Sequence, residues 1–245
     1  MHEERFYRKV MKPRDLVCYQ VQHRETDLFC CTRTDLHDVV LDRVLIYRRQ
    51  LDQYIQYRPE FKGSLSPIPI DSLAPPIAKE MITVSTELGV GPMATVAGAF
   101  AEFTGRDIAA KSVTFIIENG GDICLKTNVE RIVQIYANNS PFSGTIGIKL
   151  KPKDFPYGVC TSSATVGPSL SLGRADAVCT IAASALFADG LATYLGNIVK
   201  KKEDIPIAIE KGQGFAGVIG ILIILGKHLG LWGDIEIVQL NGLQQ

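Results

Sequence analysis

Residues 112–122 read Ser-Val-Thr-Phe-Ile-Ile-Glu-Asn-Gly-Gly-Asp, a run of β-branched and aromatic residues that ends in two glycines and an acid. Such a run over about 112–118 is typical of a buried strand, and Asn-Gly is a favoured two-residue turn between antiparallel strands. Three more β-type runs follow at about 123–127, 131–137 and 145–150. Their short spacing predicts an antiparallel meander rather than strands that alternate with helices.

The stretch before this block predicts a hairpin and a helix. Two β-type runs, at 16–22 and 28–33, flank the polar residues between them, as in a β-hairpin. Apolar residues then recur at helical spacing from Val39 to Ile55, and Asp35 is a suitable N-cap for that helix.

Further helices and one strand are expected on both sides of the block. Residues 77–87 have a helical pattern, and Pro92 is well placed in the first turn of a second helix. Residues 176–181 read as a strand, and Ser184 caps an Ala-rich helix that runs to about residue 199. Strands and helices thus occur in blocks, which indicates an α+β fold with one or more antiparallel sheets packed against helices.

The length of 245 residues, with 46% hydrophobic content, is enough to bury a substantial core. We expect a single domain over 1–245. Within it, residues 1–58 form the N-terminal hairpin and helix, residues 59–76 a Pro-rich connection, and residues 77–245 the core that carries the motifs described below.

The most apolar stretch, residues 215–226, is shorter than the ~20 residues that a membrane span requires, so we assign it to the core. Residues 227–233 look like a turn. The alternating residues 234–240 then predict a half-buried strand paired with the apolar stretch. The charged residues 1–8 lack the apolar region of a secretory signal, and we expect a cytoplasmic protein.

Composition excludes some partners. Lys and Arg total 26, as do Asp and Glu, so the formal net charge is +0 and no bulk attraction to nucleic acid or acidic membranes is expected. Neutrality also favours self-association into a homo-oligomer. The six cysteines show no Cys-x-x-Cys spacing, and we expect reduced, buried thiols. Cys30 and Cys31 would point to opposite faces of a strand.

Asp189 and Thr193 form the first candidate site. They lie four residues apart in a stretch of small and apolar residues, so on a helix both side chains fall on one face. A carboxylate and a hydroxyl are hard oxygen ligands, which suit Mg²⁺ that holds a phosphate ester. The alternative is a helix that buries Ala and Leu while Asp189 faces solvent.

Asn119, Gly120, Gly121 and Asp122 form a second polar group at the end of the first strand of the block. Paired glycines let backbone approach a ligand closely, and the same residues also form a favoured hairpin turn. Both interpretations can hold at once. The sequence leaves open whether Asp122, or the preceding Glu118, acts as a base or as a ligand.

A third group lies in the hydroxyl-rich stretch 161–167, where Thr161, Ser162 and Ser163 have hydroxyls and amides able to bind phosphate oxygens. Arg174 follows it and is a candidate phosphate contact, with Asp176 positioning Arg174 or a backbone amide. The alternative for these two residues is a surface ion pair.

Taken in order, these groups resemble the motifs of the ApbE family, flavin transferases that use FAD and Mg²⁺ to attach FMN to a threonine of a target protein. The family's Ala-Lys-Gly helix motif looks like residues 93–100, its Asn-x-Gly-Gly-Asp like 118–122, and its Thr-Ser-Gly like 161–163. Its Asp-Ala-x-Ala-Thr metal motif is closest to residues 189–193. The resemblance implies a T-fold-like α+β domain, with Asp189 and Thr193 as metal ligands.

The chain looks even more like a second, uncharacterised ApbE-related family. In that family Gly-Pro-Met-Ala at 91–94, Glu-Asn-Gly-Gly-Asp at 118–122, Gly-Arg-Ala-Asp-Ala at 173–177 and Ala-Asp at 188–189 recur together. The similarity covers about residues 80–200 with specific motifs and the remainder loosely. It implies that the second and third groups, together with Arg174 and Asp176, bind a flavin or other nucleotide.

The chain also departs from the transferase pattern. The transferases carry His-His-Ile-x-Asp-Pro after Thr-Ser-Gly, whereas residues 167–174 here contain no histidine, and Ala97 replaces the lysine before Gly98. Three functions therefore remain open. The chain is a Mg²⁺-dependent FMN transferase with a protein acceptor, a non-catalytic flavin or nucleotide-phosphate binder acting as carrier or sensor, or a structural oligomer with a vestigial site.

Overall fold

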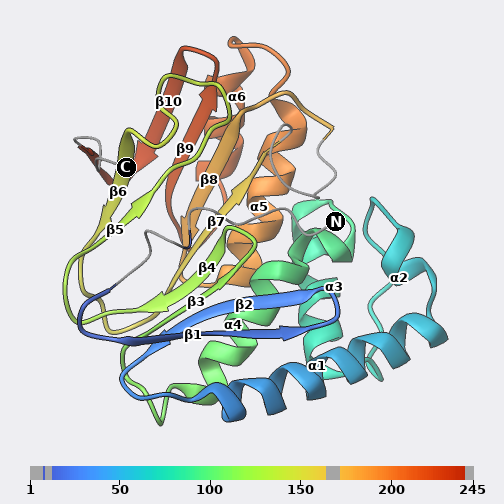
Figure 1. The fold of residues 1–245 in the computed structure, drawn as a ribbon. Coiled ribbons are helices and arrows are strands. Elements are labelled where there is room, and N and C mark those ends of the chain that lie inside the picture. The colour runs from blue at the N-terminus through green and yellow to red at the C-terminus, as the bar shows by residue number, and fades with distance from the viewer. Residues whose placement is uncertain (1–7, 9–12, 164–171, 241–245) are drawn as a thin grey trace.

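A large antiparallel sheet forms the centre of the molecule (Figure 1). The computed structural model describes residues 8, 13–163 and 172–240. Among these, the sheet has eight strands, and every neighbouring pair is antiparallel. In spatial order the strands are β1 (Val17–His23), β2 (Thr26–Thr32), β3 (Phe115–Asn119), β4 (Asp122–Lys126), β7 (Tyr157–Ser162), β8 (Ala177–Ala182), β9 (Val218–Leu225) and β10 (His228–Gly233).

Helices cover one face of this sheet. Their apolar faces and the inward side chains of the strands form one core, in which Phe115 and Ile117 of β3 take part. The predicted helices at 39–55, at 77–87, after Pro92 and after Ser184 are all present. The helical elements are α1 (His37–Tyr57), α2 (Glu60–Gly63), α3 (Pro76–Leu88), the 3-10 helix η2 (Pro92–Thr95), α4 (Val96–Ile108), α5 (Ala185–Ile198) and α6 (Asp204–Gln213).

A small second sheet covers the opposite face. It consists of β11 (Glu236–Gln239), β6 (Ile146–Leu150) and β5 (Arg131–Gln134), in that order. Its side chains join a second core with the alternate residues of the large sheet, such as Ile116 of β3. Because both faces are covered, the central strands read as nearly continuous apolar runs. The α+β class is confirmed.

The predicted meander is wrong between its second and third strands, although its third and fourth strands, β5 and β6, do pair with each other antiparallel. β3 and β4 are neighbours as expected, but the other neighbour of β4 is β7, and β5 and β6 lie in the small sheet. The strand ranges themselves are close to the predicted ones. Which strand pairs with which depends on how the two apolar faces are covered, and short spacing alone does not specify that.

The C-terminal prediction holds for the half-buried strand within 234–240, which is β11, but not for the turn or for the pairing. Residues 227–233, expected to be a turn, contain β10, which pairs with the apolar strand β9. The turn between them has only two residues, Gly226 and Lys227, and Gly226 has a φ of +58° that favours glycine. The last strand, β11, pairs with β6 and not with the apolar stretch.

The cysteine prediction holds in part. Cys30, Cys124, Cys160 and Cys179 are free and buried, but Cys18 and Cys31 form a disulfide. They are directly opposite each other on β1 and β2, with Cα atoms 4.1 Å apart, and sequence spacing gave no sign of this register. Cys30 packs in the core under the helices and Cys31 in the core under the small sheet, so the predicted opposite orientation is confirmed.

The N-terminal hairpin is confirmed, and it extends the large sheet at the β3 edge. The following helix starts one residue later than Asp35 implied, because its N-cap is Leu36, and Asp35 instead accepts the backbone N–H of His37 at 2.8 Å. In the described part of the chain, no helix combines the length and apolar composition that crossing a bilayer requires.

Candidate functional site

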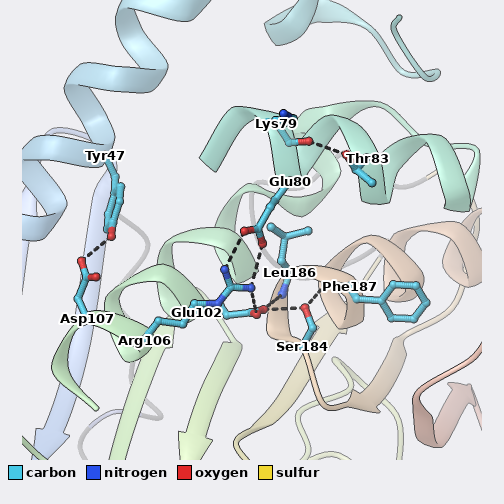
Figure 2. Close-up of polar contacts among 10 residues, drawn as sticks. All are labelled: Tyr47, Lys79, Glu80, Thr83, Glu102, Arg106, Asp107, Ser184, Leu186 and Phe187. Atoms are coloured by element: carbon cyan, nitrogen blue, oxygen red, sulfur yellow. Dashed lines mark hydrogen bonds and ion pairs between the residues drawn. The ribbon is translucent and has the colours of Figure 1, made fainter. Parts of the chain in front are cut away.

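The start of α5 is tied firmly to α4. Ser184 is the N-cap, and its hydroxyl accepts the backbone N–H of Phe187 at 3.1 Å, as the sequence predicted. Glu102 of α4 accepts both the Ser184 hydroxyl, at 2.7 Å, and the backbone N–H of Leu186, at 2.9 Å (Figure 2). A carboxylate on these donors also interacts favourably with the helix dipole.

Glu102 is itself held in place. Arg106, one turn further along α4, donates to Glu102 and forms a two-point ion pair with Glu80 of α3 at 2.8 and 2.9 Å (Figure 2). The side chain of Glu102 is buried. Sequence reasoning missed this residue, although an acid within the apolar run 99–103 is a signal that it requires a buried partner.

Asp189 makes the reciprocal contact. It lies in the second turn of α5, and its Oδ2 accepts the backbone N–H of Gly98 at 2.8 Å, at the start of α4. Gly98 allows this approach, because a Cβ there would lie 2.2 Å from the backbone oxygen of Ala185. Each of the two helices therefore receives a carboxylate from the other at its N-terminal end. Asp189 faces α4, which differs from the solvent-facing alternative.

The twin-glycine turn meets the same end of α4. Gly120 and Gly121 join β3 to β4 with φ of +70° and +101°, the left-handed region that Asn-Gly turns favour. Glu118 accepts the backbone N–H of Gly121 at 2.8 Å, which fixes the turn. Asn119 donates from its amide to the backbone oxygen of Ala97 at 3.2 Å. The hairpin interpretation of these residues is confirmed.

Asp122 completes the group, which we call the carboxylate pair of Asp122 and Asp189. Burial raises the pKa of Asp122 well above its usual range, and the negative charge of Asp189 raises it further, while the backbone N–H of Thr161, 3.2 Å from Oδ1, opposes the shift. Burial raises the pKa of Asp189 to about 7, against the backbone N–H groups of Gly98 and Ala97. The structure thus brings the two acids within electrostatic reach of each other.

The three hydroxyl-bearing residues Thr161, Ser162 and Ser163 do not all lie on one face of the sheet. Thr161 pairs with Cys179 and hydrogen-bonds its thiol, on the face of the small sheet, so only the backbone of Thr161 reaches Asp122. Ser162 alternates to the helix face, the side of Asp189. Ser163 is buried. The rest of this stretch, 164–167, lies outside the described residues.

Thr193 and the Arg174–Asp176 segment differ in their placement. Thr193 is partly buried one turn after Asp189 on α5, which puts it on the same helix face. Asp176 accepts the backbone N–H of Gly226 at 2.7 Å and so fixes the β9–β10 turn. Arg174 is exposed beside the C-terminal end of α5, where its backbone N–H donates to Val199. These two described side chains form no ion pair with each other.

A divalent metal fits this site only together with a ligand. Across residues 8, 13–163 and 172–240, no group of three or more His, Cys, Asp or Glu side chains is arranged to hold a metal. Mg²⁺, however, usually keeps several waters and is bound by one or two carboxylates plus substrate phosphates. The carboxylate pair meets that requirement, because Asp122, which is buried, and Asp189, which is partly buried, both have raised pKa values and need either a proton or a cation between them.

The carboxylate pair predicts a distinctive dependence of stability on pH. Without metal, both acids have raised pKa values in the folded state, so the stability they contribute is present below about pH 4 and is lost as pH rises through about 7. Asp122→Asn should remove much of this loss. The melting temperature of the variant, relative to that of the wild type, should therefore rise as the pH increases from 5 to 8. The exposed acid Asp38, changed to Asn, is the control. Parallel curves for Asp122→Asn and wild type would contradict this interpretation.

Comparisons with known proteins identify relatives of the chain. The sequence profile of the family described as AbpE bacteria matches residues 8–213. A UPF0280 protein of Methanocaldococcus jannaschii is 40% identical over 204 residues, which cover 81% of this chain and 83% of that protein. A UPF0280 protein of Methanothermobacter thermautotrophicus is 42% identical over 209 residues, 83% of this chain and 81% of that protein.

Among solved structures, the apo form of the flavinyl transferase ApbE of Pseudomonas stutzeri is similar, with a TM-score of 0.54. The match covers 89% of this chain and 93% of that chain at 12% sequence identity. At that identity the likeness concerns the fold, and it shows that this arrangement of sheets and helices is the ApbE arrangement.

Proposed function

Because the chain belongs to the family described as AbpE bacteria, with UPF0280 proteins among its relatives, we propose that it binds FAD with Mg²⁺ and transfers FMN to a threonine of a protein. The observation that carries the proposal is that Asp189 and Asn119 both bond the backbone at the start of α4, with Asp122 within electrostatic reach of Asp189. The fold shared with the flavinyl transferase ApbE of Pseudomonas stutzeri supports it.

In this proposal the pyrophosphate of FAD lies against the twin-glycine turn and α5. A Cβ at Gly121 would have no atom within 4 Å, so the turn borders open space that a ligand can occupy. Asp189, Asp122 and Thr193 would hold the metal, and Asn119, Gly120, Gly121 and the 161–163 segment would line the phosphate. Arg174 and Asp176 remain predictions from the sequence alone.

The reaction is a phosphoryl transfer. A bond forms between the threonine Oγ and the phosphorus of the FMN half, and the bond from that phosphorus to the bridging oxygen breaks, so that AMP leaves. When bound, Mg²⁺ supplies positive charge that stabilises the pyrophosphate oxygens. The chain positions the two reactants, and the proton of the threonine leaves to water.

A second candidate is a carrier or sensor that binds the flavin nucleotide without transferring it. Two sequence features favour it: the absence of the His-His-Ile-x-Asp-Pro segment, and Ala97 where the transferases have lysine. In this structure the backbone oxygen of Ala97 accepts a hydrogen bond from the side-chain amide of Asn119. Residue 97 therefore contacts the twin-glycine turn through its backbone, which does not require a lysine side chain. Binding can therefore persist without transfer.

Both candidates are tested by one experiment. The purified protein is incubated with FAD, with or without Mg²⁺, and a threonine-containing acceptor, and covalent flavin and AMP are measured. Transfer predicts Mg²⁺-dependent flavinylation and equal AMP, both missing in Asp189→Asn. A Mg²⁺-dependent rise in melting temperature with FAD but no product supports the binder. If FAD with Mg²⁺ gives no covalent product and no rise in melting temperature, both candidates are wrong.

The cellular location belongs to this proposal as well. We place the activity in the cytoplasm. The Cys18–Cys31 disulfide argues in the other direction, since disulfides persist mainly in oxidising compartments.

A further inference from the structure

Helix α1 presents an unpartnered outer face. Its buried residues pack against β1, α3 and α4, and the helix runs along the outside of the helical layer, at the lower edge of Figure 1. On the outward side, Leu45 and Ile46 are 38% and 41% exposed. These two aliphatic side chains form a small apolar centre in the middle of the exposed helix face.

Two charges flank this apolar centre. Asp42 lies one turn before it and Arg49 one turn after it, both exposed. Neither forms an ion pair with any residue that the structure describes. The neighbouring charges differ in this respect, because Arg48 pairs with Glu25 and Asp52. Asp42 and Arg49 are therefore available to a partner.

We propose that this face binds a second copy of the chain, with the two α1 helices antiparallel. When the two-fold axis passes between Leu45 and Ile46, Leu45 of each copy packs on Ile46 of the other, and Asp42 of each copy faces Arg49 of the other. The charges of the two copies match only when the two α1 helices are antiparallel, because a parallel pair would place Asp42 beside Asp42 and Arg49 beside Arg49. A two-fold dimer uses the same patch on both subunits, as this pattern requires.

The surface around α1 extends the contact beyond one helix. An open hollow of about 490 Å³ is lined by Asp42, Leu45, Ile46, Arg49, Gln50 and Gln53. A second hollow of about 360 Å³ adjoins it at the β1–β2 turn, where His23 and Arg24 lie. In the proposed dimer, side chains of the second copy would lie in these two hollows. The formal net charge of +0 adds no bulk repulsion between copies.

The test is the mass in solution, measured by light scattering and sedimentation equilibrium from about 1 to 200 µM, where modest interfaces associate. The wild type should reach twice the 26.8 kDa of the chain. Asp42→Arg and Arg49→Asp, each alone, should weaken the dimer at least about tenfold, and the double variant should restore it. Glu87→Arg, a charge change on α3, is the control. A monomer at every concentration, or a dimer that neither single variant weakens, would overturn the proposal.

Crosslinking tests the geometry independently. An equimolar mixture of Leu45→Cys and Ile46→Cys chains should form a covalent dimer under mild oxidation, because residue 45 of one copy lies against residue 46 of the other in the proposed dimer. The described free cysteines are all buried and should not compete. Leu231→Cys is a matched control, since Leu231 is also exposed but lies on β10, at the opposite edge of the large sheet from β1. Equal crosslinking of the control and the mixture would contradict the antiparallel α1 contact.

Discussion

Replacing Asp189 by alanine is expected to abolish the Mg²⁺-dependent stabilisation of the protein by FAD and to lower the stability of the protein itself. The first effect follows from the loss of one of two carboxylates at the proposed metal position. Residues that only hydrogen-bond to metal ligands already contribute about 10–100-fold to metal affinity. We therefore expect the loss of Asp189, a direct ligand in the proposal, to weaken Mg²⁺ binding by more than about 100-fold. The second follows from the lost acceptor for the Gly98 N–H, a cap worth about 0.5–2 kcal/mol.

The matched variant Asp189→Asn separates the two effects. Its amide oxygen can still accept the Gly98 N–H, whereas its neutral side chain is a poor Mg²⁺ ligand and removes the repulsion with Asp122. We therefore expect a melting temperature at pH 8 without metal at or above that of the wild type, together with loss of the Mg²⁺ effect. Titration calorimetry and thermal unfolding measure both. Retained Mg²⁺ affinity in Asp189→Asn would rule out Asp189 as a ligand.

Gly98→Ala is expected to produce the second large effect, even though alanine is the better helix former by about 1 kcal/mol. The added Cβ would lie 2.2 Å from the Ala185 oxygen and 2.8 Å from the Asp189 Cβ, so α4 and α5 must separate. Overpacking of this kind costs about 1–3 kcal/mol and here outweighs helix propensity. The same shift pulls the Gly98 N–H away from Asp189, so FAD and Mg²⁺ binding should weaken as well.

Gly63→Ala is the control for this substitution. Gly63 is also helical, but a Cβ there would meet nothing within 4 Å, so the change should leave unfolding by urea nearly unaltered. If Gly98→Ala proves as stable as Gly63→Ala, the close crossing of α4 and α5 does not constrain the site.

The comparison of sequence and structure is most instructive at the candidate site. Spacing alone indicated that Asp189 and Thr193 share a helix face and that the twin glycines form a turn. It did not indicate that Asp189 reaches the start of α4, or that Glu102 holds α5 from the other side. These contacts join residues more than eighty positions apart, and no local pattern encodes such a distance.

The sequence by itself determined the features whose causes lie within a few residues. The Ser184 cap, the Asn119–Gly120–Gly121–Asp122 turn and the α+β class follow from side-chain hydrogen bonds, left-handed glycines and apolar periodicity. Tertiary structure alone decided that β4 pairs with β7, that β11 joins β6, and that Asp122 comes within electrostatic reach of Asp189. Those outcomes depend on which apolar faces pack together, and that is a property of the whole folded chain.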